Sequence, residues 1–181
     1  TVFALAGEVK EATKGYFNIR HHGAYDPSGL VKGWAISNAA GLIRQQGFFN
    51  FYVDAGGDFQ VSGKNPRGAD WRVGIRSPFN QREIVKVLSL TDGGVATSGT
   101  YVRGQHIYDP YHPGQSITDI LSLTVIGPDV YDADCLATAA FAMGKDGIQF
   151  IEAQEGFEGY LIDAQGMATF TSGFERVVAH D

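Results

Sequence analysis

The sequence predicts an α+β domain, and two observations favour that class. Short β-prone runs follow one another between residues 48 and 99, separated by Gly, Pro, Asn and Asp, as successive antiparallel strands are. Longer stretches with apolar residues at helical spacing lie before and after these runs. Because the 181 residues show no internal repeat, linker or low-complexity segment, we expect a single domain.

Helices are expected where apolar residues recur on one face. The predicted helices are 2–13, 29–46, 132–143 and a short one at 147–153. Ser28 is the candidate cap of the second helix, and Gly144 closes the third.

Strands are expected in the short β-branched or aromatic runs. The predicted strands are 16–19, 48–55, 58–63, 71–76, 83–90, 93–99, 105–108 and 121–126, with a hairpin of 160–163 and 167–171. The almost continuously apolar run 121–126 is typical of a central strand. Along 105–108, alternation would turn His106 and Tyr108 to one side and Ile107 to the other.

Composition excludes several classes of protein. The chain is 44% hydrophobic and 12% aromatic, which is ordinary for a globular protein and argues against disorder. It carries a formal net charge of -6 and no basic run, so nucleic acid is not an expected partner. No stretch approaches the roughly 18 apolar residues of a membrane span. Cys135, the single cysteine, is interpreted as a small core residue.

The first residues bear on completeness and location. The chain begins at Thr1, directly in a helical pattern, so we expect it to be part of a longer protein. It shows no signal sequence and no lipid-anchor cysteine, which slightly favours a cytoplasmic over a periplasmic or extracytoplasmic location but leaves the compartment open.

Asp134 and Thr138 are the strongest chemical lead. Four residues apart, they lie on one face of the predicted helix 132–143 and offer two hard oxygens to a small cation such as Mg²⁺. The alternative is a solvated Asp beside a Thr that bonds back to its own helix. Chemistry alone leaves both interpretations open.

A second lead is the start of the predicted helix 29–46. Its free N–H groups at Ser28 and Gly29, with Lys32 one turn later, would attract a phosphate. An ordinary capped helix start has the same residues. Similarly, Gly56 and Gly57 between Asp54 and Asp58 fit either a close approach to a ligand or a tight hairpin turn.

The segment that ends the strand 93–99 could also contact a ligand. Thr97, Ser98 and Gly99 are small enough to approach a planar molecule, and His106 follows with a titratable imidazole near Asp109. Ser98 with His106 as base is a weaker hydrolase interpretation, because no G-x-S-x-G elbow is present. The remaining histidines lack metal-ligand spacing.

Taken together, several blocks resemble the ApbE family of FAD:protein FMN transferases. They are DPSGLVKGWA (26–35), YVDAGGDFQVSG (52–63), WRVGIRSP (71–78), GVATSGTYVRGQHIYDP (94–110) and SLTVIGPDVYDADCLATAAFAMG (122–144). The resemblance implies a T-fold-like domain over residues 1–181 with mostly antiparallel sheets packed against helices. Family members usually have a longer N-terminal part, which this chain would lack.

The same resemblance implies an activity. The enzyme would bind FAD with Mg²⁺ and join FMN through a phosphoester to a Thr or Ser of a partner flavoprotein. Two rivals use the same site: hydrolysis of FAD to FMN and AMP, or FAD binding without catalysis.

The resemblance also assigns residues. The metal ligands would be Asp134, Thr138 and the carbonyl of Gly29. His106 would be the catalytic histidine, with Asp109 holding its loop. The expected FAD contacts are Tyr16, Phe17, Asn18, Asp26, Gly29, Lys32, Thr97, Ser98, Gly99, His106 and Ile107.

Overall fold

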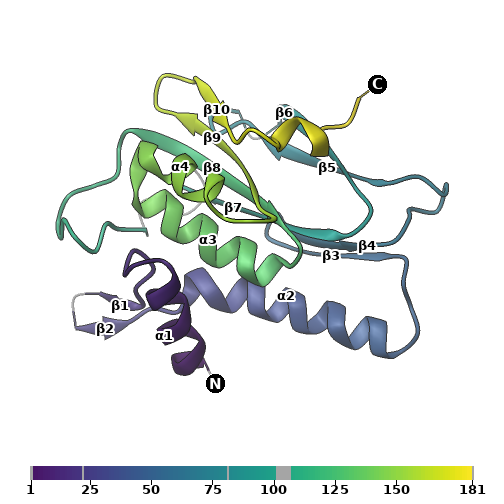
Figure 1. Ribbon diagram of the computed structural model, residues 1–181, viewed down its shortest axis with the longest axis horizontal. Coiled ribbons are helices and arrows are strands. Elements are labelled where there is room, and N and C mark those ends of the chain that lie inside the picture. The colour runs from purple at the N-terminus through teal and green to yellow at the C-terminus, as the bar shows by residue number, and fades with distance from the viewer. Residues whose placement is uncertain (1, 22, 81, 101–106, 181) are drawn as a thin grey trace.

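A six-stranded antiparallel sheet forms the centre of the fold (Figure 1). The computed structural model describes residues 2–21, 23–80, 82–100 and 107–180. The strand order is β10-β9-β8-β7-β4-β3. The strands are β3 (Phe51–Ala55), β4 (Asp58–Ser62), β7 (Gly93–Gly99), β8 (Ile120–Gly127), β9 (Glu158–Asp163) and β10 (Ala168–Phe170). The apolar strand β8 lies inside the sheet, as its sequence predicts.

A two-stranded sheet covers one face of this large sheet. It consists of β5 (Trp71–Arg76) and β6 (Ile84–Leu90), and a 3₁₀ turn (Phe174–Val177) packs beside it. Val73, Leu88 and Phe174 are buried in the core between the two sheets.

Helices cover the opposite face of the large sheet (Figure 1). They are α2 (Ser28–Gln45), α3 (Val130–Ala142) and α4 (Gly147–Glu152), with a 3₁₀ turn (Gly144–Asp146) before α4 and a small hairpin of β1 (Arg20–His21) and β2 (Ala24–Tyr25) before α2. The first helix, α1 (Val2–Ala12), packs against α2 and α3. Because side chains alternate along a strand, Val95 of β7 belongs to the core beneath β5 and β6, whereas Ala96 belongs to the core beneath α3.

Hydrogen bonds fix the start of α3 on the sheet. Asp129 is its N-cap and accepts the N–H of Tyr131 at 2.8 Å, while Gln60 of β4 accepts the N–H of Val130 at 2.8 Å. Gly94 of β7 is essential to this contact, because a Cβ there would lie 2.1 Å from the nitrogen of Val130. α3 is therefore held at its first turn by two strands.

Two glycines of α2 allow it to cross α3 closely. A Cβ at Gly33 would lie 2.8 Å from Cβ of Asp134, and one at Gly29 would lie 2.9 Å from Oγ1 of Thr138. Both distances are shorter than real Cβ contacts, so the backbone of α2 approaches α3 in a way that a side chain would prevent.

Most predicted elements are confirmed. The helix predicted at 2–13 is α1, the one at 132–143 is α3, and the C-terminal hairpin is β9 with β10. In the described ranges, no helix combines the length and apolarity that crossing a membrane requires. Cys135 is buried in the core, as expected, and burial raises the pKa of its thiol.

Some local predictions are wrong. Residues 16–19 are not a strand, because the N–H of Tyr16 and that of Phe17 turn back to the carbonyl and hydroxyl of Thr13. Ser28 does not cap α2; it is the first helical residue, and its N–H donates to Asp26 at 2.9 Å.

Two strand predictions differ from the structure at their ends. β3 begins at Phe51 and not at residue 48. Of the predicted strand 105–108, the first two residues lie outside the described ranges and the last two are not in a strand.

We expect the contact of α2 with α3 to be sensitive to a single methyl group. Gly33→Ala should lower the free energy of unfolding by about 1–3 kcal/mol, because a Cβ would collide with buried atoms of α3. Gly41→Ala is the matched control in the same helix: nothing lies within 4 Å of its Cβ position, so alanine should stabilise by up to about 1 kcal/mol. Urea unfolding measures both, and equal effects would contradict the close crossing.

Candidate functional site

A cleft of about 640 Å³ lies where α2, α3 and the end of β7 meet the segment around Tyr16. The structure brings together in its lining every described residue that the sequence assigned to FAD or metal. These are Tyr16, Phe17, Asn18, Asp26, Gly29, Lys32, Thr97, Ser98, Gly99, Ile107, Asp134 and Thr138. They come from segments up to about a hundred residues apart, so a shared cleft supports the assignment of one site.

The cleft borders the part of β7 that extends beyond the start of β4. β4 begins at Asp58 and pairs with β7 from Phe59, which lies opposite Val95, whereas β7 continues beside β8 to Gly99. At the start of β4, the N–H of Thr97 donates to Oδ1 of Asp58 at 3.1 Å. Beyond the start of β4, residues from both faces of the large sheet can therefore line the same cleft.

Three oxygen-bearing groups line the cleft at the crossing of α2 and α3. Oγ1 of Thr138 lies 3.4 Å from the carbonyl oxygen of Gly29, and Asp134 lies one turn before Thr138 on α3. Asp134 is only 4% exposed, and its Oδ2 accepts the N–H of Gly33 at 2.8 Å. A carboxylate, a hydroxyl and a carbonyl form a hard donor set that suits Mg²⁺ better than Zn²⁺.

The described residues offer no rival metal site of another kind. Among them, no group of three or more His, Cys, Asp or Glu is placed to hold an ion. A metal at the crossing of α2 and α3 would meet two neutral oxygens and the carboxylate of Asp134, a set that fits an ion that keeps water or substrate oxygens as further ligands.

A buried ion pair connects α2 to the sheet in the cleft. Nζ of Lys32 lies 2.6 Å from Oδ2 of Asp58, and the two side chains are 24% and 2% exposed. Of the two aspartates beside the Gly56–Gly57 turn, it is Asp54 that bonds the turn backbone, because its Oδ1 accepts the N–H of Gly57 at 3.1 Å.

Two tyrosines attach the loop after residue 106 to the segment around Tyr16. The hydroxyl of Tyr108 is shared between the backbone carbonyl oxygens of Asn18 and Arg20. The hydroxyl of Tyr111 donates to the backbone carbonyl of Lys14. The rings of Tyr16 and Tyr111 lie 4.9 Å apart. Burial raises the pKa of the Tyr108 hydroxyl, so it is a donor and not an anion at neutral pH.

The two predicted catalytic residues have different outcomes. His106 lies outside the described ranges, so its place in the cleft stays a prediction, as does the pairing of Ser98 with it. Asp109 does not line the cleft. Its carboxylate accepts the N–H of Tyr111 at 2.8 Å and contacts Nδ1 of His112 at 2.6 Å, which agrees with a role in holding the loop.

Sequence reasoning missed part of the cleft wall. Gly74 and Arg76 of β5 and Ile84 of β6 line it, as does Tyr108. The block 71–78 carries part of the family resemblance and contains Gly74 and Arg76, but the resemblance assigns no role to either residue. A further signal was alternation along β5, where Arg72, Gly74 and Arg76 are exposed between buried residues.

Comparison with known sequences places this geometry among related proteins. The profile of the ApbE family matches residues 8–161. An FAD:protein FMN transferase of Vibrio cholerae is 34% identical over 141 residues, which are 72% of this chain and 42% of that protein. The one of Escherichia coli strain K12 is 29% identical over 150 residues, or 78% and 43%. The chain thus spans less than half the length of these curated relatives.

Solved structures share the fold. The flavin transferase ApbE from Vibrio cholerae superposes with a TM-score of 0.82 at 23% identity, covering 97% of this chain and 75% of that one. The ApbE protein from Thermotoga maritima gives a TM-score of 0.82 at 22% identity, covering 99% and 77%. These likenesses confirm the predicted α+β, ApbE-like arrangement.

The ion pair of Lys32 and Asp58 should be strongly coupled. In a double-mutant cycle with Lys32→Ala and Asp58→Ala, we expect a coupling energy of about 1–3 kcal/mol, because either single change leaves a charge in a desolvated place. Lys64 and Asp70 are the matched control: their atoms are also 2.6 Å apart, but the side chains are 48% and 39% exposed. Their coupling should be much smaller. Equal coupling in urea unfolding would show that burial does not matter here.

Proposed function

Because the chain belongs to the ApbE family, we propose that it is a Mg²⁺-dependent transferase that attaches the FMN part of FAD to a Thr or Ser of an acceptor flavoprotein. The observation that carries this proposal is the oxygen cluster of Asp134, Thr138 and Gly29 inside a cleft of about 640 Å³. It combines a place for a hard cation with room for an extended ligand.

The proposed reaction exchanges a phosphoanhydride bond for a phosphate ester bond. The acceptor hydroxyl oxygen forms a bond to the phosphorus on the FMN side of the pyrophosphate, and the bond from that phosphorus to the bridging oxygen breaks. AMP leaves, and the hydroxyl proton is taken up by a base. Positioning and neutralisation of charge supply most of the catalysis in such transfers.

The chain's own residues have distinct proposed parts. Asp134, Thr138 and the Gly29 carbonyl would hold Mg²⁺, which when bound supplies positive charge against the phosphate oxygens. Asp26 and Lys32 would contact FAD. His106 would take the hydroxyl proton, with Asp109 ordering the loop that follows it.

The remaining cleft residues would orient the flavin and exclude water. Tyr16, Phe17 and Asn18 border one side, and Phe17 is 2% exposed, so its ring is fixed by packing. Thr97, Ser98 and Gly99 form the end of β7, where Oγ1 of Thr97 lies 2.8 Å from Oγ1 of Thr124. Ile107 adds an apolar contact.

Mass spectrometry tests the function directly. The protein is incubated with FAD, MgCl₂ and a Thr-bearing candidate acceptor, and the acceptor is weighed while free nucleotides are separated. A gain equal to FMN minus water, with release of AMP, is the expected result. Free FMN and AMP with an unchanged acceptor would indicate hydrolysis, and intact FAD that stays bound would indicate binding alone.

Asp134 should be indispensable to metal-dependent transfer. Asp134→Ala should abolish it, and Asp134→Asn is the sharper variant, because the amide oxygen can still accept the N–H of Gly33 while the charge is lost. We expect the Asn variant to lose at least about 100-fold in rate at saturating FAD. The control Asp132→Asn removes an exposed carboxylate from the same helix. Transfer by Asp134→Asn with an unchanged Mg²⁺ dependence would remove this residue from the metal site.

A further inference from the structure

The cleft carries more negative than positive charge. Among its described lining residues are the four carboxylates of Asp26, Asp54, Asp58 and Asp134 and the two cations of Lys32 and Arg76. The proposed ligand is itself an anion at its pyrophosphate. Positive groups that remain available to a ligand are therefore few, and their location matters for binding.

Lys32 is not fully available. Its ammonium lies 2.6 Å from a carboxylate that is 2% exposed, and the same carboxylate accepts the N–H of Thr97. Moving the ammonium to a ligand would leave Asp58 as a charge with little solvent around it, which is costly. Most of the charge of Lys32 is therefore offset within the protein.

Arg76 is different. It is exposed at the end of β5 and lines the cleft, and among the described residues no ion pair involves it. It stands opposite Ile84, where the register of β5 and β6 shifts between Ile75 and Arg76. Such irregularities redirect a side chain at the edge of a sheet. The guanidinium is thus a cation on the cleft wall whose charge no described carboxylate offsets.

The backbone that carries Arg76 is well fixed. β5 pairs with β6 along its whole length, and the next residue, Ser77, donates its N–H to the carbonyl of Glu83 at 2.9 Å. Gly74, two residues earlier on the same side, has no side chain, and that of Ile84 lies over it: a Cβ at Gly74 would be 2.9 Å from Cδ1 of Ile84. Arg76 is therefore presented from a rigid wall with an apolar neighbour.

We propose that Arg76 binds a phosphate group of the dinucleotide and so makes the cleft selective for phosphate-bearing ligands. This inference rests on the proposed function, since it takes FAD as the ligand. A guanidinium offers paired N–H donors in the geometry that phosphate oxygens require, and it stays charged at every relevant pH. Arg76 lies on β5, on the other side of the sheet from α2, so it would hold the ligand from a second direction.

The test compares FAD with inorganic pyrophosphate. FAD is titrated into the protein by calorimetry, and pyrophosphate is titrated as a competitor of FAD at constant free Mg²⁺. Arg76→Gln should raise the Kd of FAD and the inhibition constant of pyrophosphate together, roughly 10- to 100-fold. Arg76→Lys should give an intermediate loss, because it keeps the charge but not the paired donors.

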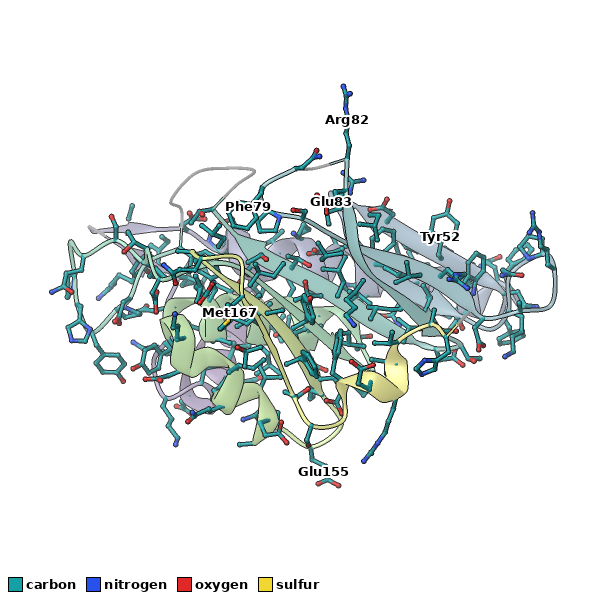
Figure 2. All side chains as sticks on the ribbon, turned by 90° about the horizontal axis from the view of Figure 1, so that it is seen from above. Tyr52, Phe79, Arg82, Glu83, Glu155 and Met167 are labelled. Carbon is teal, nitrogen blue, oxygen red and sulfur yellow. The ribbon has the colours of Figure 1, made fainter. Side chains whose placement is uncertain are left out.

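Arg82→Gln is the matched control. It makes the same chemical change six residues later, and Figure 2 shows Arg82 projecting away from the body of the molecule. Both constants should stay within twofold of the unsubstituted protein. Thermal unfolding of the three variants shows whether any loss comes from misfolding.

Each other outcome has a defined meaning. Unchanged constants in Arg76→Gln overturn the inference. A weaker FAD with an unchanged pyrophosphate constant overturns it too, because the guanidinium would then act on a ring. The same holds if pyrophosphate does not compete with FAD in the unsubstituted protein. If the unsubstituted protein fails to bind FAD at all, the proposed function falls as well, which separates the two failures.

Discussion

The close crossing of α2 and α3 is the constraint on which the candidate site depends. Gly29 and Gly33 bring the backbone of α2 so near α3 that a Cβ at either position would lie within 3 Å of Thr138 or Asp134. The same approach places the Gly29 carbonyl beside the Thr138 hydroxyl and buries the Asp134 carboxylate against the N–H of Gly33. A looser crossing would separate the three oxygens, so helix packing and the proposed metal site are one feature.

The second constraint is that β7 extends beyond the start of β4. Where their pairing ends, Asp58 is left at the border of the sheet, and it binds both Lys32 of α2 and the backbone of Thr97. The ion pair thus joins the helical layer to the sheet beside the opening. The cleft is lined by α2 and α3, which lie on one face of the large sheet, and by β5 and β6, which lie on the other. That geometry lets residues of two layers act on one ligand.

The loop after residue 106 is attached by hydrogen bonds to the segment around Tyr16. Hydroxyls of Tyr108 and Tyr111 donate to backbone carbonyls of the segment around Tyr16, and Asp109 orders the turn between them. Neutral tyrosine hydroxyls suit this role, and burial raises the pKa of the Tyr108 hydroxyl. The segment around Tyr16 and the loop after residue 106 are thereby fixed relative to each other, even though about ninety residues separate them.

The sequence by itself determined the α+β class and most helices and strands, and the family resemblance of its motifs named part of the residues that line the cleft. Periodicity and turn residues are local signals, and the motifs around Gly29, Thr97 and Asp134 can be recognised in the sequence without a structure. It could not locate the turn at residues 16–19 or the bond from the N–H of Ser28 to Asp26 before α2, because single hydrogen bonds decide them. Only the tertiary structure decided that Asp58 pairs with Lys32 and that Arg76 borders the same cleft. Those contacts depend on how the layers pack and where the pairing of β4 with β7 stops, which no local pattern encodes.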